Sequence, residues 1–259
     1  MRWIRYSLAG VTSYGIVEDE LIAEVTGSPF AEHARTGRRV PLADVKIELP
    51  VMPQTFYCVG LNYAEHVTAA AKKMGLPVTL PTQPDVGYRA QNALIAHGED
   101  VIIPAHATEK VQYEGELVVV IGKRAKGLSK ADALSCVLGY TIGNDVSERS
   151  WQKSDKTLWR AKNSDTFKPM GPWIETDVRL DDLITICRVN GRETERFKTN
   201  DMIFGIADFI AAITSIATLH PGDVIWMGTD GASPNLVSGD VVEIEITGIG
   251  MLRNRFIRH

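Results

Sequence analysis

The sequence predicts a mixed β protein with few helices, in the α+β class. Short apolar runs of strand length recur along the 259 residues, and glycine, proline and charged residues bound them. Helical patterns are few and do not alternate regularly with the strands. A doubly wound sheet requires that alternation, so we expect mixed or antiparallel sheets instead.

Residues 1–50 are expected to form a small β-rich subdomain, and residues 51–259 a larger second domain. The apolar runs at 14–17 and 21–25 flank a turn of three acidic residues, which is the pattern of a β-hairpin. The stretch 40–50 has the pattern of a further short strand with a turn on either side.

The sequence pattern changes at residue 55. A short buried strand is predicted at 56–60, and a helix at 64–74 that Gly75 and Pro77 end. Three prolines and little periodicity predict a loop over residues 77–92. The remaining pattern predicts strands near 101–103, 116–121, 139–142, 184–189, 224–227 and 241–246, and helices at 129–137 and 201–218.

Composition and charge argue against nucleic-acid binding and membrane association. The net charge is −4, and no cluster of lysine and arginine supplies the basic patch that nucleic acid or an anionic membrane surface needs. The longest apolar run, near 203–219, contains Asp208 and is too short to span a bilayer. The three cysteines are far apart and form no CxxC pair. We therefore expect a soluble cytoplasmic protein with reduced thiols.

Two glutamates one residue apart lead into an apolar, strand-like run at residues 113–122. Strand side chains alternate between faces, so Glu114 and Glu116 point the same way. Like charges on one face repel each other and resist desolvation, and a hard divalent cation between them would relieve both effects. The alternative is that both carboxylates lie at a solvated strand end, and this segment alone leaves both interpretations open.

A third carboxylate, Asp145, follows the apolar strand predicted at 139–142. A lone aspartate there is commonly a helix cap or turn residue, but with the glutamate pair it would complete a three-carboxylate site. Such a site suits Mg²⁺ or Mn²⁺, whereas no cysteine or histidine lies at the spacing that zinc requires. Arg149, Gln152 and Lys162 follow closely, and each alone has the pattern of a solvated surface residue.

Six stretches of the chain resemble signatures of the fumarylacetoacetate hydrolase family, of the acylpyruvate hydrolase, 5-carboxymethyl-2-hydroxymuconate isomerase and 2-hydroxyhepta-2,4-diene-1,7-dioate isomerase type. The resemblance implies a β-roll of mixed sheets, usually a homodimer, with one Mg²⁺ or Mn²⁺ per subunit. The stretches occur in family order, at residues 59–66, 113–117, 143–149, 162–167, 221–225 and 248–254.

The resemblance also implies roles for individual residues. Lys162 would contact the substrate and balance developing negative charge, and His66 would be the general base on a short helix that closes over the site. The metal ligands would be Glu114, Glu116 and Asp145. The substrate's oxygens would be bound by Arg149, Gln152, Thr229 and Arg89.

The sequence departs from the family pattern in three places. Many hydrolases of the family have a glutamate three residues after the histidine, and the pair activates water, but this chain has Ala69 there. Asp230 stands where a proline is usual after Gly-Thr, and Tyr88-Arg89 replaces a common Phe-Lys. The first departure matters most, because a histidine without a carboxylate partner is less well oriented and less basic.

The substrate class that the resemblance implies is a 2-oxo or 2,4-dioxo acid from aromatic compound catabolism. A metal that chelates its carboxylate and carbonyl would act as a Lewis acid and stabilise an enolate. The leading hypothesis is hydrolytic C–C cleavage of an acylpyruvate or fumarylpyruvate. The alternative is isomerisation or decarboxylation of a hydroxymuconate-type dienoic acid, which Ala69 favours because it removes the usual glutamate. A third hypothesis is a non-catalytic binding protein. The motifs leave open the far end of the substrate and the choice between Mg²⁺ and Mn²⁺.

Overall fold

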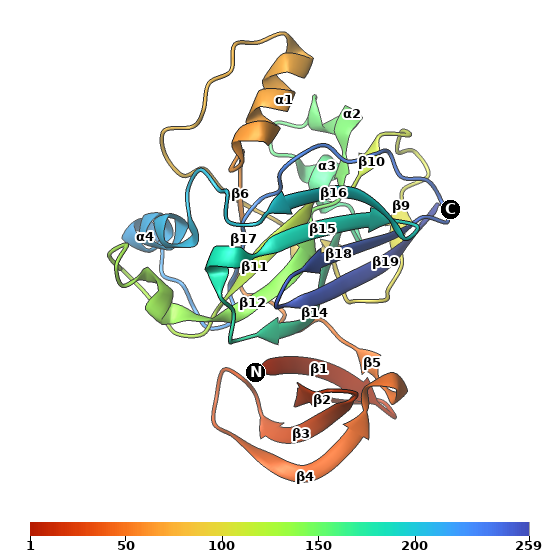
Figure 1. Ribbon diagram of the computed structural model, residues 1–259, viewed down its shortest axis with the longest axis vertical. Coiled ribbons are helices and arrows are strands. Elements are labelled where there is room, and N and C mark those ends of the chain that lie inside the picture. The colour runs from red at the N-terminus through yellow and green to blue at the C-terminus, as the bar shows by residue number, and fades with distance from the viewer. Residues whose placement is uncertain (259) are drawn as a thin grey trace.

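The computed structural model describes residues 1–258, which form three β-sheets and few helices (Figure 1). The largest sheet has 12 strands, the second has five and the third has two. Most neighbours are antiparallel, but β6 (Phe56–Val59) pairs in parallel with β17 (Val224–Trp226), and β9 (Val101–Ile103) with β19 (Gly250–Arg258). Mixed sheets with few helices are what the sequence predicts, and this fold class is confirmed.

The N-terminal strands form one end of the largest sheet, drawn red to orange in Figure 1. The predicted hairpin is confirmed, with Tyr14 opposite Val25. The first strand, which the sequence patterns do not reveal, pairs with β14 (Lys168–Glu175) and so joins this end to the rest of the sheet. The five strands are β1 (Arg2–Leu8), β2 (Val11–Glu18), β3 (Leu21–Gly27), β4 (His33–Pro41) and β5 (Lys46–Ile47).

The middle of the large sheet is a run of strands that carry the candidate site. Every residue of β11 (Gly115–Ile121) is buried, which explains its uninterrupted apolar pattern, because a strand covered on both faces need not alternate. In spatial order the run is β14, β12 (Val137–Asn144), β11, β17, β6 and β7 (Val86–Tyr88), with β8 (Leu94–Ile95) beside β14.

The five-stranded sheet packs against β11 and β12, and the core lies between them. A Cβ atom on Gly115 would lie 2.8 Å from Cys187 Sγ and 3.0 Å from Ile244 Cγ2, so the two sheets approach closely at the start of β11. The order of this sheet is β16 (Arg192–Lys198), β15 (Ile184–Val189), β18 (Val241–Ile246), β19 and β9, and the third sheet pairs β10 (Val111–Gln112) with β13 (Ser147–Glu148).

The helices lie around the sheets. The predicted helix α1 (Ala64–Met74) has the expected bounds, and Gly75 ends it in the left-handed conformation at φ 68°. The helices α2 (Arg149–Gln152) and α3 (Trp159–Asn163) are short, whereas α4 (Ile206–Ile216) packs a buried apolar stripe against the core. Among residues 1–258 no helix is long and apolar enough to cross a membrane.

Two helix predictions need correction. The predicted helix at 129–137 is wrong, since only a 3₁₀ turn forms at Ala133–Cys136. Ser129 Oγ accepts a hydrogen bond from the Asp132 amide as an N-cap does, but β12 begins at Val137, so the chain makes only one 3₁₀ turn before it becomes extended. The predicted helix at 201–218 shortens to α4, because Asp208 Oδ2 accepts a hydrogen bond from the Gly205 amide and caps the helix there.

Most predicted strands are present with small changes of bounds, but the strand predicted within 40–50 is reduced to β5 after a 3₁₀ turn at Leu42–Asp44, and several other strands were missed. The predicted loop at 77–92 contains β7, in which Tyr88 lies opposite Tyr57 of β6. Two prolines interrupt the pattern of β14, and most residues of β16 are exposed, so neither shows the alternation that identifies a half-buried strand.

Candidate metal centre and active site

Three carboxylates meet where β11 begins and β12 ends. Glu114 immediately precedes β11, Glu116 is its second residue, and Asp145 directly follows β12. One ligand oxygen from each lies within 4.8 Å of the others, and all three residues are buried. The antiparallel pairing places Gly115 opposite Asn144, so the register of the two strands brings the carboxylates together.

The backbone at this corner is held on several sides. The Asp145 amide donates to Glu114 O over 2.9 Å, and the Glu114 amide donates to Asn144 Oδ1 over 3.1 Å. A Cβ atom on Gly143 would lie 2.6 Å from the ring of Trp226, so β12 also packs tightly against that indole. The carboxylates therefore extend from a fixed scaffold, as a preorganised site requires.

Two short helices bring Lys162 and Arg149 to the carboxylates. Lys162 Nζ, from α3, lies 2.5 Å from Glu114 Oε2 and 2.6 Å from Asp145 Oδ2. Arg149 Nη1, from α2, lies 2.6 Å from Glu114 Oε1 and donates to Gln152 Oε1 over 3.1 Å. The structure thus brings together residues that, taken singly, had the pattern of surface positions.

Arg89 and Lys168 add two more cations beside Asp145. Arg89 binds both carboxylate oxygens, with Nε 3.1 Å from Oδ1 and Nη2 2.9 Å from Oδ2. Lys168 Nζ lies 2.8 Å from Oδ1, and its side chain is fully buried. The sequence reasoning missed Lys168, although a lysine directly after the apolar Phe167, at the start of a strand, was an available signal.

These contacts shift the carboxyl pKa values in opposite directions. Burial alone would raise the pKa of Glu114, but Lys162 and Arg149 outweigh it and lower the pKa to about 2. Burial and the charges of Asp145 and Glu114 raise the pKa of Glu116 to about 8. Burial lowers the pKa of the Lys168 ammonium to about 8, against the attraction of Asp145.

The donor set fits a hard divalent cation. The cluster offers three carboxylates and neither sulfur nor imidazole, which suits Mg²⁺ or Mn²⁺ better than zinc. Within the part of the chain that the structure describes, one hydrogen bond, from the Gly228 amide over 2.9 Å, is recorded for the Glu116 carboxylate. A cation would stabilise the charged form of Glu116 that its neighbours Glu114 and Asp145 oppose.

His66 and Thr229 lie near the cluster. His66 stands in the first turn of α1, close enough to Glu114 for a positive charge on its ring to lower the pKa of that carboxyl. His66 Nδ1 lies 3.0 Å from Gly231 O. Thr229 is buried, and it directly follows Gly228, whose amide binds Glu116. Gln152 and Thr229 are thus placed by neighbours that contact the cluster, Arg149 and Gly228 respectively.

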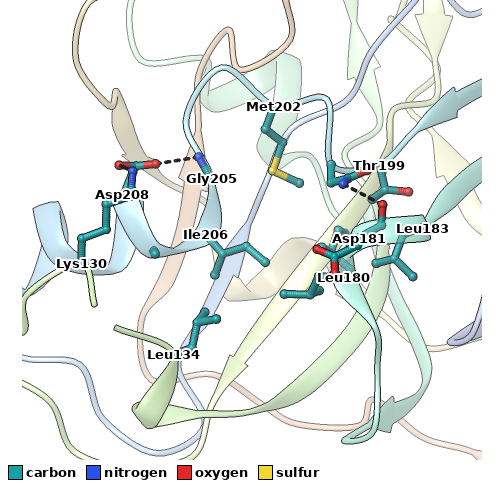
Figure 2. Close-up of a pocket in the computed structure, with 13 residues that line it drawn as sticks. Lys130, Leu134, Leu180, Asp181, Leu183, Thr199, Met202, Gly205, Ile206 and Asp208 are labelled. Carbon is teal, nitrogen blue, oxygen red and sulfur yellow. Dashed lines mark hydrogen bonds and ion pairs between the residues drawn. The ribbon is translucent and has the colours of Figure 1, made fainter. Parts of the chain in front are cut away.

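A separate cavity of about 330 Å³ lies on the other side of β11 (Figure 2). Leu117 lines it, and successive strand side chains alternate, so the cavity and Glu116 are on opposite faces of the strand. Its walls are mainly apolar, and Asp208 at its edge already binds the Gly205 amide and Lys130. The cavity contains none of the clustered carboxylates, so the candidate site is not there.

Two family models match the chain. The model described as fumarylacetoacetate (FAA) hydrolase C-terminal matches residues 55–257, and an Rv2993c-like N-terminal model matches residues 1–50. The chain belongs to the fumarylacetoacetate hydrolase family. This confirms the resemblance that the six sequence stretches indicated.

Known relatives of this fumarylacetoacetate hydrolase family member include proteins of mycobacteria and mitochondria. Protein Rv2993c of Mycobacterium tuberculosis is 41% identical over 240 residues, which cover 91% of this chain and 87% of the relative. The mitochondrial oxaloacetate tautomerase FAHD2A of Homo sapiens is 35% identical over 231 residues, which cover 84% of this chain and 71% of the relative.

Solved structures of similar proteins share the whole fold. The 5-carboxymethyl-2-hydroxymuconate delta-isomerase from Mycobacterium smegmatis has a TM-score of 0.90 and 35% identity, and all of both chains is covered. Maleylpyruvate hydrolase from Sphingobium sp. SYK-6, in complex with manganese(II) and pyruvate, has a TM-score of 0.80 and 25% identity, over 100% of this chain and 99% of that chain. Family membership thus indicates an enzyme of a group that contains isomerases, tautomerases and hydrolases.

Proposed function

We propose that this protein is a divalent-metal-dependent enzyme that transfers a proton at the carbon beside the carbonyl of a 2-oxo acid. The observation that carries the proposal is the buried carboxylate cluster and the cations that face it. Burying so many charges is costly, and such clusters of perturbed groups gather at functional sites. A 2-oxo acid offers the cluster a carboxylate and an adjacent carbonyl oxygen.

In this proposal Glu114, Glu116 and Asp145 hold one Mg²⁺ or Mn²⁺ per subunit. When bound, the ion would act as a Lewis acid toward the oxygens of the substrate. The four cations beside the cluster outnumber its three carboxylates by one positive charge, so the site attracts an anionic substrate before any ion is counted. That excess favours a substrate with one or more carboxylate groups.

Donor counting separates the roles of the two lysines. An ammonium group has three N–H donors, and Lys162 uses two of them on Glu114 and Asp145. Lys168 uses all three, on Asp145 and on the carbonyl oxygens of Val146 and Phe167. We therefore assign substrate contact to Lys162, which has a donor to spare among its recorded contacts, and a structural role to Lys168.

Arg149, Gln152 and Thr229 remain our candidates for binding the oxygens of the substrate. Arg149 and Gln152 face the cluster together, and both are partly accessible. Arg89 donates from Nε and Nη2 to the two carboxylate oxygens of Asp145, and its side chain is buried. We therefore propose that Arg89 orients the Asp145 carboxylate and meets substrate only through that residue.

His66 would act as the general base that takes the proton from carbon and returns it. Hydrolysis additionally requires an activated water, and Ala69 supplies no carboxylate for the His-Glu pair that activates water in many family hydrolases. We therefore place isomerisation or tautomerisation ahead of hydrolytic cleavage, which the motifs alone had put first. The 35% identity to an isomerase and to a tautomerase supports this order.

Hydrolytic C–C cleavage is the second candidate. Its specific support is the similarity to maleylpyruvate hydrolase over nearly the whole of both chains. Isomerisation, decarboxylation and cleavage share one enolate, which forms by loss of a proton, by loss of carbon dioxide or by transfer of an acyl group to water, so the residues of the cluster serve each outcome.

A single NMR experiment in D₂O separates these candidates. Metal-stripped protein is reloaded with Mg²⁺ or Mn²⁺ and mixed with pyruvate, oxaloacetate, fumarylpyruvate and a hydroxymuconate-type dienoic acid. Deuterium uptake at C3 or a shifted double bond, without cleavage, supports the proposal. Release of pyruvate and a second acid would move the function to hydrolysis. Binding without exchange or turnover over the whole panel would leave a binding protein.

We also propose that residues 1–50 and 51–259 are separate domains.

A further proposal is that the chain forms a homodimer. Leu76, Val78 and Leu80 follow α1 in a segment that stands away from the sheets in Figure 1, and all three are exposed. Exposed apolar side chains so close in sequence suit a partner surface. Light scattering on the full chain tests the dimer, and a monomer at micromolar concentration would contradict it.

A further inference from the structure

One loop connects the carboxylate cluster with the helix that carries His66. It is the segment 228–232, between β17 and β18. At its start, the Gly228 amide donates to Glu116 Oε2 over 2.9 Å. Two residues later, Asp230 Oδ1 accepts hydrogen bonds from the His66 amide over 3.1 Å and from the Gly231 amide over 2.9 Å. The loop therefore touches both parts of the candidate site.

Asp230 occupies the capping position at the N-terminus of α1. The first amides of a helix have no partner within it, and the residue before α1, Tyr63, provides no side-chain cap. The amide that Asp230 accepts is that of His66, the third residue of the helix, which is the amide that a capping side chain usually binds. The negative charge also lies at the positive end of the helix dipole. Asp230 thus caps α1 from a distant part of the chain.

The neighbouring carbonyl fixes the tautomer of His66. A carbonyl oxygen only accepts hydrogen bonds, so the 3.0 Å contact between His66 Nδ1 and Gly231 O places the proton on Nδ1. The lone pair of the neutral ring is then on Nε2, which is the nitrogen that remains for proton transfer. In a His-Glu pair a carboxylate would do the same, and Ala69 leaves that place without one.

The loop has little freedom to turn its carbonyl elsewhere. Gly231 has φ 72°, a left-handed conformation that favours glycine, and its Cα lies against the Glu195 carboxylate. Asp230 Oδ1 also binds the Gly231 amide and so holds the peptide just before Gly231, while the Ala232 amide, on the same peptide as the carbonyl that faces His66, hydrogen-bonds the Glu195 carboxylate.

We propose that Asp230 is a positioning residue that replaces the missing carboxylate partner of His66, by capping α1 and presenting the Gly231 carbonyl to Nδ1. This inference rests on the proposed function only for the role of His66 as the base. Capping and the tautomer are properties of the free protein and are measured without substrate.

The test compares Asp230→Ala with Asp230→Asn in the full chain. The ¹⁵N chemical shifts of the His66 ring report the tautomer, and hydrogen exchange reports the His66 amide. Asp230→Ala should move the ring toward the Nε2–H form and speed exchange of the amide by about five- to tenfold, the size of a lost cap. Asp230→Asn keeps the acceptor oxygen and should stay close to wild type.

Two further variants sharpen the comparison. Asp240→Ala is the matched control, because Asp240 accepts a hydrogen bond from the Val237 amide in the same inter-strand segment and its hydrogen bonds among the described residues do not reach α1. It should leave the His66 shifts unchanged. Ala69→Glu in the Asp230→Ala background should restore the Nδ1–H form, since a glutamate three residues on lies on the same helix face. A purely structural role of Asp230 would not produce this rescue.

The outcomes distinguish this inference from the proposed function. An unchanged tautomer and an unchanged amide exchange rate in Asp230→Ala would overturn the positioning role. A changed tautomer with about tenfold lower kcat and a similar KM supports both proposals. A changed tautomer with unchanged kcat supports the positioning role and overturns His66 as the base. If Asp230→Ala does not fold, loss of the Nδ1–H signal in a folded Asp230→Leu protein, which keeps the size of the side chain without an acceptor, supports the inference, and its retention overturns it.

Discussion

Glu114 and Glu116 stand two residues apart on the same side of one strand end, yet they meet opposite electrostatic environments. Glu114 lies against Arg149 and Lys162, which lower its pKa to about 2 despite burial. Burial and the charges of Asp145 and Glu114 raise the pKa of Glu116 to about 8. The pair is therefore one carboxylate in direct ion pairs with two cations and one that makes no ion pair within 4 Å among the residues that the structure describes.

The first prediction concerns metal binding by the metal-free protein. At pH 7 the Glu116 carboxyl is below its pKa of about 8 and is mostly protonated, so a bound cation must displace that proton. We expect release of close to one proton per ion, and an affinity that rises by up to about tenfold per pH unit until pH 8. Titration calorimetry with Mn²⁺ in buffers of different ionisation enthalpy measures both.

The matched control for metal binding is Glu116→Gln, which keeps the shape of the side chain. It should bind Mn²⁺ much more weakly and release no proton. Equal affinity of wild type at pH 6 and pH 8 would show that Glu116 is already ionised in the metal-free protein.

The second prediction separates the two buried lysines. Lys162→Met removes the lysine that has a donor to spare, and we expect turnover to fall by about 100-fold or more. Lys168→Met leaves the carbonyls of Val146 and Phe167 without their donor, so we expect a loss of about 2–4 kcal/mol in stability and a smaller loss of turnover. Urea unfolding and steady-state kinetics on both variants decide the assignment. Equal kinetic effects of the two changes would contradict it.

The carboxylate cluster was predictable because its signals are local in the sequence. Like charges on one strand face, followed by an apolar run, indicate a cation wherever that strand is buried, and Glu114 and Glu116 show this within a few residues. Asp145 needed one further inference, that the end of a second strand lies beside the first. The family motifs then supplied the order of the parts.

The contacts around the cluster were not predictable in the same way. Lys168 reaches Asp145 only through the fold of β14, and Asp230 reaches the His66 amide from more than 160 residues away. No local pattern encodes such contacts. The strands β1 and β16 were missed because their burial depends on which neighbour covers them, a tertiary property that overrides local propensity.

The third prediction concerns Glu195, on β16, which packs against Gly231. Burial raises its pKa to about 7, against a hydrogen bond from the backbone of Ala232. The folded protein then binds more protons than the unfolded chain between about pH 4.5 and 7. The stability is therefore fully present below pH 4.5 and declines as the pH rises through 7.

Glu195→Gln should remove that decline. The side chain is partly exposed, so we expect a gain of only about 1–2 kcal/mol over wild type at pH 8 and little difference at pH 4.5. Urea unfolding of both proteins at the two pH values measures this. A parallel pH dependence in wild type and variant would assign the decline to other groups.

The fourth prediction concerns the contact between Gly143 and Trp226, which supports the end of β12 beside Asp145. A methyl group at residue 143 would lie 2.6 to 2.8 Å from three ring atoms of Trp226, so Gly143→Ala must displace the indole or the strand. We expect a loss of about 1–3 kcal/mol in stability, the usual cost of overpacking. Metal affinity should also fall, because Asp145 moves with the strand.

A compensating change tests whether the cause is size. Trp226→Phe frees space for the new methyl group and also removes the buried Trp226 indole N–H, which has no hydrogen-bond partner within the described part of the chain. In the Gly143→Ala background it should therefore recover much of the lost stability and of the affinity for Mn²⁺. If the double variant is as weak as the sum of the two single changes, the two residues do not act through this contact.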